Sequence, residues 1–188
     1  ALTLPLACII IYTRIRFHEY SYGIAATVAL VHDVCITLGF VVLFNRLGLV
    51  HAEIDLSLIA AFLTIIGYSL NDTIVVFDRI RENLELEKKL GGEDGGFEGL
   101  VDRSVNQNLS RTVLTSVTTF LAVGVIFFIN RGVESVLEGF AFAMCIGIIV
   151  GTYSSVFVAN PVVVLLQKRM SGKSGDDSKT TEAKVIAN

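Results

Sequence analysis

Charged residues are scarce in this sequence. They make up only 18% of the 188 residues, and a formal net charge of −3 gives no indication of a nucleic-acid partner. Hydrophobic residues make up 53%, the mean hydropathy is +0.66, and the charges are confined to a few segments. Apolar runs of membrane-spanning length in such a pattern are typical of a polytopic membrane protein rather than a soluble domain.

Cysteine is also rare, and no catalytic motif is recognisable. Cys8, Cys35 and Cys145 lie far apart, each inside an apolar run, so we interpret them as small buried hydrophobic residues rather than disulfide partners or metal ligands. Without a nucleophile triad, a metal-ligand motif or a phosphate-binding loop, the sequence predicts neither an enzyme nor a cofactor. The chain begins at Ala1 without an initiator methionine, so we interpret it as a piece of a longer protein.

Five apolar segments predict an all-α bundle of transmembrane helices over residues 1–170. They cover residues 2–17, 22–44, 54–77, 112–129 and 137–166. The connector 84–111 has apolar residues at helical spacing, which fits a helix along the inner membrane surface and fits an ordinary amphipathic connector equally well. Residues 171–188 are polar and predict a disordered cytoplasmic tail.

The basic residues predict how this bundle is oriented. Of the 15 lysine and arginine residues, all but Arg46 and Arg131 fall on the same side of the predicted spans. Lysine and arginine are enriched in cytoplasmic loops. We therefore expect the amino terminus outside and the carboxyl terminus inside.

The most informative residue is Asp72, near the inner end of segment 54–77. A carboxylate inside a membrane span costs roughly 2.5–3.5 kcal/mol on insertion scales and by default indicates an ion or proton pathway. Helical spacing places Tyr68 and Ser69 on its face. Burial disfavours the charged carboxylate and a nearby cation favours it, so Asp72 can take up and release a proton; Arg111 is the candidate cation. The alternative is a static buried pair.

Two further polar groups can serve Asp72 or only hold helices in place. The start of segment 112–129 is rich in hydroxyls, including Thr115 and Ser116, which can hold water or a proton or simply bond to their own backbone. His32 and Asp33 form a second ionisable site in the middle of a span. They can join a proton relay, and fixed polar contacts that pin the helix are an equally good interpretation.

Segment 137–166 carries a stripe of small residues at four-residue spacing, one per helical turn. These residues are Gly139, Ala143, Gly147, Gly151 and Ser155. Small side chains allow membrane helices to approach closely. The stripe therefore predicts helix packing rather than a chemical role.

Four stretches of the sequence resemble the SecF family, the smaller half of the SecD–SecF protein-export pair in the resistance–nodulation–division superfamily. They are His32-Asp33-Val34 and residues 67–83, 106–116 and 148–155, and the resemblance covers roughly residues 1–166. It implies six membrane helices with a large extracytoplasmic domain between the first and second. This chain would hold helices two to six of that arrangement.

The resemblance also implies a function. It implies a multi-pass protein of the bacterial cytoplasmic (inner) membrane, partnered by SecD and docked on the SecYEG translocon. Proton-motive force would help to move an emerging preprotein across the lipid bilayer, with Asp72 and Arg111 in the positions of the family's proton-pathway residues. The alternatives are a proton-driven exporter of small molecules from the same superfamily and a structural membrane scaffold in which Asp72 only ties helices together.

Overall fold

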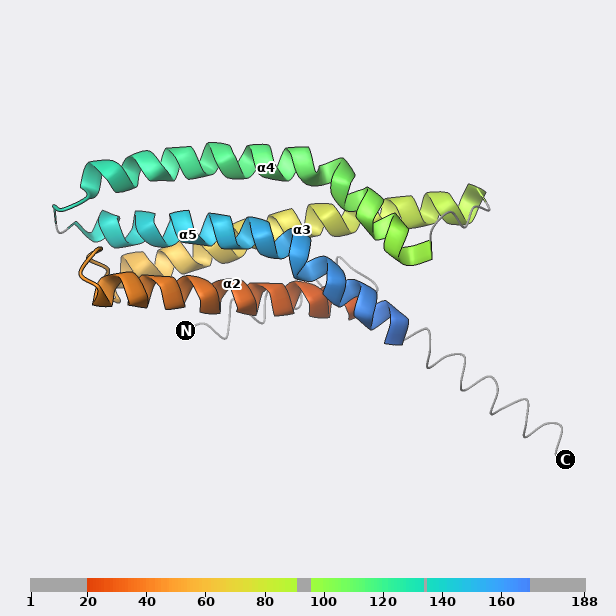
Figure 1. Cartoon of the computed structure of the whole chain (residues 1–188), viewed down its shortest axis with the longest axis horizontal. Coiled ribbons are helices and arrows are strands. Elements are labelled where there is room, and N and C mark those ends of the chain that lie inside the picture. The colour runs from red at the N-terminus through yellow and green to blue at the C-terminus, as the bar shows by residue number, and fades with distance from the viewer. Residues whose placement is uncertain (1–19, 91–95, 134, 170–188) are drawn as a thin grey trace, which may run out of the picture.

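The computed structural model describes residues 20–90, 96–133 and 135–169, and this part of the chain is helical with no β-strand. Its four long helices are α2 (Tyr20–Arg46), α3 (Leu56–Leu90), α4 (Gly96–Asn130) and α5 (Val136–Phe157) (Figure 1). A shorter helix over residues 159–169 follows α5. The predicted all-α class is confirmed. The predicted helix 2–17 and tail 171–188 lie outside the described residues.

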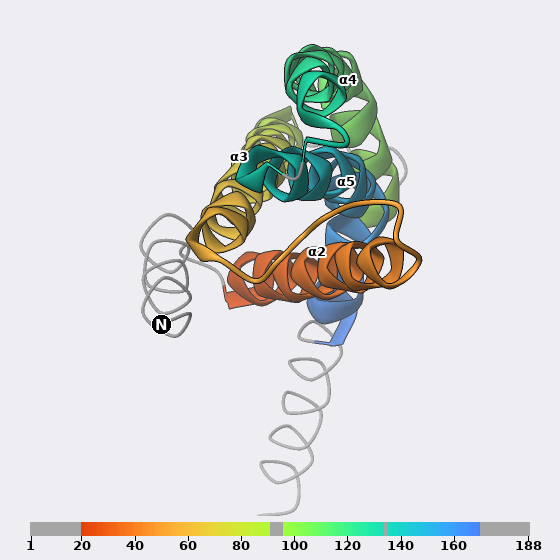
Figure 2. The same cartoon turned by 90° about the vertical axis from the view of Figure 1, so that its left-hand side faces the viewer.

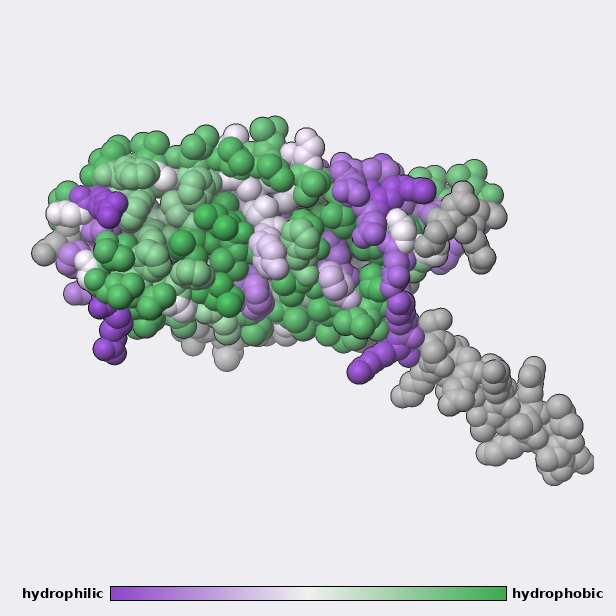
Figure 3. Space-filling model, in the orientation of Figure 1, coloured by the Kyte–Doolittle hydropathy of each residue, from purple (hydrophilic) through white to green (hydrophobic). Residues whose placement is uncertain are grey.

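All four long helices are long and apolar enough to cross a membrane. Apolar side chains form a broad belt over the middle of the surface, and hydrophilic side chains gather towards both ends of the bundle (Figure 3). A belt of this kind matches the hydrocarbon core of a bilayer, which is about 30 Å thick. The polytopic membrane bundle is therefore confirmed, while its orientation stays a prediction.

Helix α5 lies at the centre of the bundle. It packs against each of the other three long helices, and α2 and α4 lie on opposite sides of it (Figure 2). The core has two parts along the bundle axis. One is built around Tyr22 and Phe77 and the other around Phe62 and Phe142. The polar site described below lies where α2, α3 and α5 meet.

The predicted connector 84–111 is not a separate element, which corrects the predicted layout. Residues 84–90 prolong α3, and residues 96–111 form the first half of α4. The first half of α4 is held by apolar packing, with Leu100 and Val101 buried and Phe97 and Leu84 packed against the same core. Polar contacts just before residue 84 add to it. Arg79 Nε donates to Gln107 Oε1 at 2.6 Å, and Asn83 Nδ2 donates to Ser104 Oγ at 2.8 Å. The two helices thus continue as an antiparallel pair beyond their apolar spans.

The predicted fifth span, 137–166, is also interrupted. Helix α5 ends at Phe157, and the chain turns at Val158 before the helix over residues 159–169. Pro161 explains the break because it has no N–H to donate to the preceding turn. The side-chain amide of Asn160 bonds to the last turn of α5 next to the break, donating to the carbonyl oxygens of Ser155 (3.1 Å) and Val156 (3.0 Å).

Candidate functional site

Asp33 lies at the junction of three helices and has two polar partners. Only 1% of its surface is exposed. Ser69 Oγ of α3 donates to Asp33 Oδ2 at 2.5 Å, and His32 Nδ1 lies 3.1 Å from Asp33 Oδ1. A buried carboxylate needs such partners because leaving water without them is costly. Asp33 therefore links α2 to α3 within the apolar part of the bundle.

Asp72 lies on the same face of α3 as Ser69, about 4.5 Å further along the helix axis. It is 7% exposed, and its Oδ2 has no hydrogen-bond partner among the described residues. The positive charge of Arg111 on α4 acts on this carboxylate through space. Within the described ranges, no ion pair joins the two side chains. Asp72 is thus buried, close to a cation and incompletely bonded.

A chain of hydroxyls connects α3, α4 and α5 beside these carboxylates. Ser116 of α4 is buried, and its Oγ lies 2.7 Å from Thr152 Oγ1 of α5. Tyr68 of α3 donates its hydroxyl to the same Ser116 oxygen at 3.5 Å. Thr152 stands within the motif 148–155 but was not among the predicted site residues. Its position one residue after Gly151 in α5 was the available signal.

Thr115 does not share this environment. It is exposed, and its Oγ1 contacts the carbonyl oxygens of Arg111 (3.1 Å) and Thr112 (3.0 Å) in its own helix. Thr118 bonds to its own helix in the same way. The hydroxyl-rich segment therefore has two faces, with Thr112 and Ser116 inward and Thr115 and Thr118 outward.

The small residues of α5 lie where other parts of the chain pack closely against this helix. A Cβ added at Gly147 would lie 2.4 Å from Ile65 Cδ1, and one at Gly151 would lie 3.2 Å from Ser69 Cβ. At Gly139 an added Cβ would lie 3.0 Å from Ala52 Cα. Ala143 and Ser155 of the same stripe are fully buried. Gly147 and Gly151 let α3 approach α5 closely, and Gly151 lies against both Ser69 and Asp33.

A third buried acid, Glu138, was missed by the sequence reasoning. It lies in the first turn of α5, is 2% exposed, and its Oε2 lies 4.0 Å from Nδ1 of the exposed His51. The signal was a helix start of capping-box type, Ser135-Val136-Leu137-Glu138. Ser135 does cap α5, with its Oγ accepting from the Leu137 amide at 3.2 Å.

Together, these groups are polar sites in an otherwise apolar bundle. Asp33 is tied to Ser69, Asp72 has an oxygen without a hydrogen bond, and Ser116 connects the neighbouring hydroxyls. No cluster of three metal-ligating side chains occurs in the described part of the chain. The arrangement is suited to holding and transferring protons, because carboxyl and hydroxyl groups can both donate and accept them.

Sequence comparison finds relatives with a shared name. The model of a family described as "Protein export membrane protein SecD/SecF, C-terminal" matches residues 1–169. A protein translocase subunit SecF from Rhodothermus marinus is 51% identical over 168 residues, covering 89% of this chain and 52% of that protein. Another from Petrotoga mobilis is 46% identical over 170 residues, covering 90% and 51%. The chain spans about half the length of these curated relatives.

Solved structures contain the same fold. A crystal structure of SecDF in a super-membrane-facing form matches with a TM-score of 0.75 and 43% identity, over 92% of this chain and 21% of that chain. A second crystal structure is of SecDF from Thermus thermophilus, described as a translocon-associated membrane protein. It matches with a TM-score of 0.71 and 43% identity, over 85% of this chain and 20% of that chain. On its sequence and its helical arrangement alike, this chain belongs to the SecD/SecF C-terminal family of protein export membrane proteins.

Proposed function

We propose that this chain is the membrane bundle of a protein translocase subunit that works with a SecD partner. In this proposal the subunit lies in the bacterial inner membrane beside the SecYEG translocon. It uses proton-motive force to assist preprotein translocation. The names of the relatives support a role in translocation, and the SecDF structures support a SecD-type partner.

The observation that carries the proton-coupled part of the proposal is the state of Asp72. It is a buried carboxylate within an apolar helix, and one of its oxygens has no hydrogen bond among the described residues. Isolated buried charge is expensive, so a nearby cation or a bound proton must stabilise the group. Arg111 supplies the cation in this arrangement. A carboxyl group that alternates between pairing with a cation and binding a proton can carry that proton across the membrane.

The neighbouring groups have separate roles in the proposal. Asp33 is held by Ser69 and His32, so we assign it to fixing α2 against α3 beside the proton path. Ser116, which connects Tyr68 and Thr152, offers a route for protons or water between α3, α4 and α5. The exposed Thr115 takes part only if a partner or water covers its face of α4.

The test uses the full-length protein reconstituted with its SecD partner and SecYEG in vesicles. Translocation of a preprotein is measured with and without a proton-motive force. We expect Asp72→Asn to lower translocation to the rate of the wild type treated with a protonophore, because the amide cannot titrate. Asp72→Glu, which keeps the carboxyl, should retain a measurable response to the proton gradient.

Asp55→Asn is the matched control, since it also removes one carboxylate from the α3 region. Asp55 Oδ1 accepts from the Leu58 amide at 2.8 Å, and asparagine caps a helix equally well. This variant should translocate like the wild type. If Asp72→Asn kept a full response to the proton gradient, Asp72 would not be the proton carrier and the proposal would fail.

A further inference from the structure

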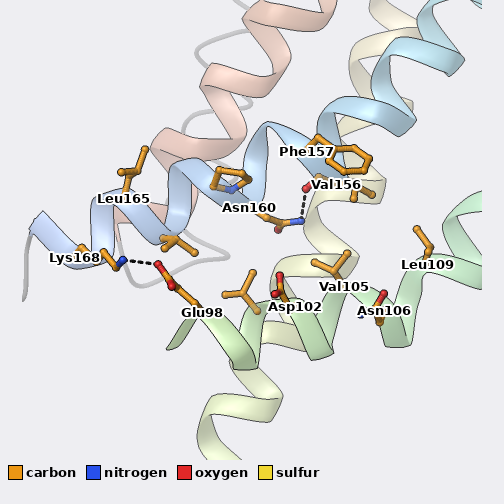
Figure 4. A pocket seen from close by; sticks show the side chains of 13 residues that line it. Glu98, Asp102, Val105, Asn106, Leu109, Val156, Phe157, Asn160, Leu165 and Lys168 are labelled. Atoms are coloured by element: carbon orange, nitrogen blue, oxygen red, sulfur yellow. Dashed lines mark hydrogen bonds and ion pairs between the residues drawn. The ribbon is translucent and has the colours of Figure 1, made fainter. Parts of the chain in front are cut away.

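An open cleft lies between the first half of α4 and the helix over residues 159–169. Its volume is about 620 Å³. It exists because the chain turns at Val158, after which residues 159–169 run at an angle to α5 (Figure 1). Polar and charged side chains from both walls point towards it, among them Glu98, Asp102, Asn160 and Lys168 (Figure 4).

This cleft adjoins an apolar groove between α4 and α5. The groove has a volume of about 420 Å³ and shares Leu109, Val156 and Phe157 with the cleft. Its lining includes Tyr153, whose ring stacks on that of Phe157 with centroids 5.1 Å apart. The two cavities therefore form one continuous depression, in which all the charged lining residues lie in the cleft and the groove is mostly apolar. That division matches the headgroup and the acyl chain of a phospholipid.

The polar end carries charges of both signs. Lys168 forms an ion pair with Glu98, and Asp102 is an exposed carboxylate outside the ion pairs of the described residues. Asn160 is 3% exposed, and its amide nitrogen is engaged by α5. Its Oδ1 has no hydrogen-bond partner among the residues described. Besides the Lys168–Glu98 ion pair, the cleft thus offers acceptor oxygens on Asp102 and Asn160, and Lys168 is the one cation of its lining.

We propose that this depression binds a phospholipid with a primary ammonium headgroup, namely phosphatidylethanolamine. The ammonium group donates to Asp102 and to Asn160 Oδ1, while Lys168 attracts the phosphate. One acyl chain lies along the groove beside Val113 and Phe157. The orientation predicted from the basic residues puts this end of the bundle in the inner leaflet. An anionic lipid fits this cleft less well, because binding sites for anionic lipids are basic pockets. Here two acids, Glu98 and Asp102, accompany a single lysine, Lys168.

Native mass spectrometry of the full-length protein tests this site. The protein is released from vesicles that contain equal parts of phosphatidylethanolamine, phosphatidylglycerol and phosphatidylcholine, and the retained lipids are counted. We expect phosphatidylethanolamine to exceed the other two by about two- to fivefold, the effect of one exposed charge contact. Asp102→Asn should reduce this excess, and Asp102→Lys should shift retention towards phosphatidylglycerol. Asp55→Asn, at the other end of α3, should leave it unchanged.

A second pair of variants tests the acyl groove. Val113→Trp fills the groove and should reduce retention of all three lipids. Val28→Trp is its matched control, because Val28 is 43% exposed on α2 and Val113 is 44% exposed on α4. Neither change touches the fully buried core. Equal lipid retention by wild type, Asp102→Lys and Val113→Trp would overturn the proposal.

The occupant is identified by photocrosslinking from position 113 in the complex with the SecD partner. Adducts to lipid are expected. Adducts to the partner subunit or to residues 171–188 in place of lipid would overturn the proposal, because the depression would then be a protein contact. The groove is also lined by Ser116 and Thr152, so the variants that test the lipid are placed at Asp102 and Val113, outside the proposed proton path. Loss of lipid binding in these variants and loss of proton-driven translocation in Asp72→Asn are therefore separate outcomes.

Discussion

Two carboxylates in the same bundle are buried to a similar degree and bonded very differently. Asp33 is 1% exposed and has polar partners at both oxygens, Ser69 and His32. Asp72 is 7% exposed and has an Oδ2 without a hydrogen bond among the described residues. Both lie in apolar helices of membrane-spanning length. Their difference is therefore one of local bonding rather than of depth.

This difference separates a stabilising role from a functional one. A satisfied buried hydrogen bond contributes about 0.5–1.5 kcal/mol, and more when one partner is charged. A buried polar group without a hydrogen bond makes no such contribution to stability. Its presence therefore needs another explanation, such as a role in proton transfer. The comparison predicts that removing the contacts of Asp33 weakens the fold, whereas neutralising Asp72 leaves the fold intact. Variants of the full-length protein, unfolded in detergent, can test each half.

The largest effect is expected from Gly147→Leu, which acts on the α3–α5 contact. An added Cβ at Gly147 would lie 2.4 Å from Ile65 Cδ1 and 2.8 Å from Ile65 Cγ2, so the helices must move apart. We expect the free energy of unfolding to fall by about 3 kcal/mol, the upper part of the usual range for overpacking. The Ser69–Asp33 hydrogen bond, one turn further along, should weaken with it.

Gly67→Leu is the matched control for Gly147→Leu. Gly67 lies on the exposed side of α3, and a Cβ added there meets nothing within 4 Å. Leucine is also the better helix former by several tenths of a kcal/mol, so stability should be unchanged or slightly higher. Adding Ile65→Ala to Gly147→Leu should restore part of the loss. Equal stability of the two leucine variants would mean that the glycine stripe does not set the helix spacing.

A smaller effect is expected from Ser69→Ala, which makes Asp33 resemble Asp72. The substitution removes the hydroxyl that donates to Asp33 Oδ2, so that oxygen loses its hydrogen bond from α3. We expect a loss of about 1–3 kcal/mol, the cost of one unsatisfied buried group. Thr64→Ala is the matched control, because the Thr64 hydroxyl is exposed and bonds to Ala60 O of its own helix. A double-mutant cycle with Asp33→Asn should show coupling between the two positions.

Most of the fold could be predicted from the sequence because hydropathy and length decide it. The four described spans fall where the apolar runs lie, and small residues at four-residue spacing mark the central helix. The helix ends were predicted less well. Packing of Leu84 and Phe97 against the core accompanies the longer α3 and α4, together with the contact between Arg79 and Gln107, and Pro161 interrupts the last span. Such pairing depends on which helices are neighbours, which a single sequence does not state.

The candidate site shows the same division. Asp33, Ser69 and Asp72 could be found because polar residues in apolar runs stand out, but their different bonding could not. Helical spacing alone did not distinguish Thr115, which faces outward, from Ser116, which faces Thr152. Adjacent residues differ by about 100° around a helix, so the choice between them depends on where the neighbouring helix lies.

The smallest effect on stability is expected from Asp72→Asn, the other half of the comparison. Asparagine keeps the size of the side chain and removes a charge whose burial is costly. Because Asp72 Oδ2 has no hydrogen bond among the described residues, the variant forfeits little. We expect a change in the free energy of unfolding within about 0.5 kcal/mol of zero, as for substitutions that break no buried contact. Asp33→Asn should cost more, since it weakens the contact with Ser69.

The relative stability of Asp72→Asn and Asp33→Asn distinguishes a proton carrier from a scaffold. If Asp72 only tied helices together, Asp72→Asn would destabilise the bundle at least as much as Asp33→Asn and would impair translocation through loss of folded protein. If Asp72 carries protons, the variant should unfold like the wild type and still lose its response to the proton gradient. Arg111→Met adds a check, because it removes the only cation that acts on Asp72 among the described residues. In Asp72→Asn, that second substitution should have no further effect on translocation.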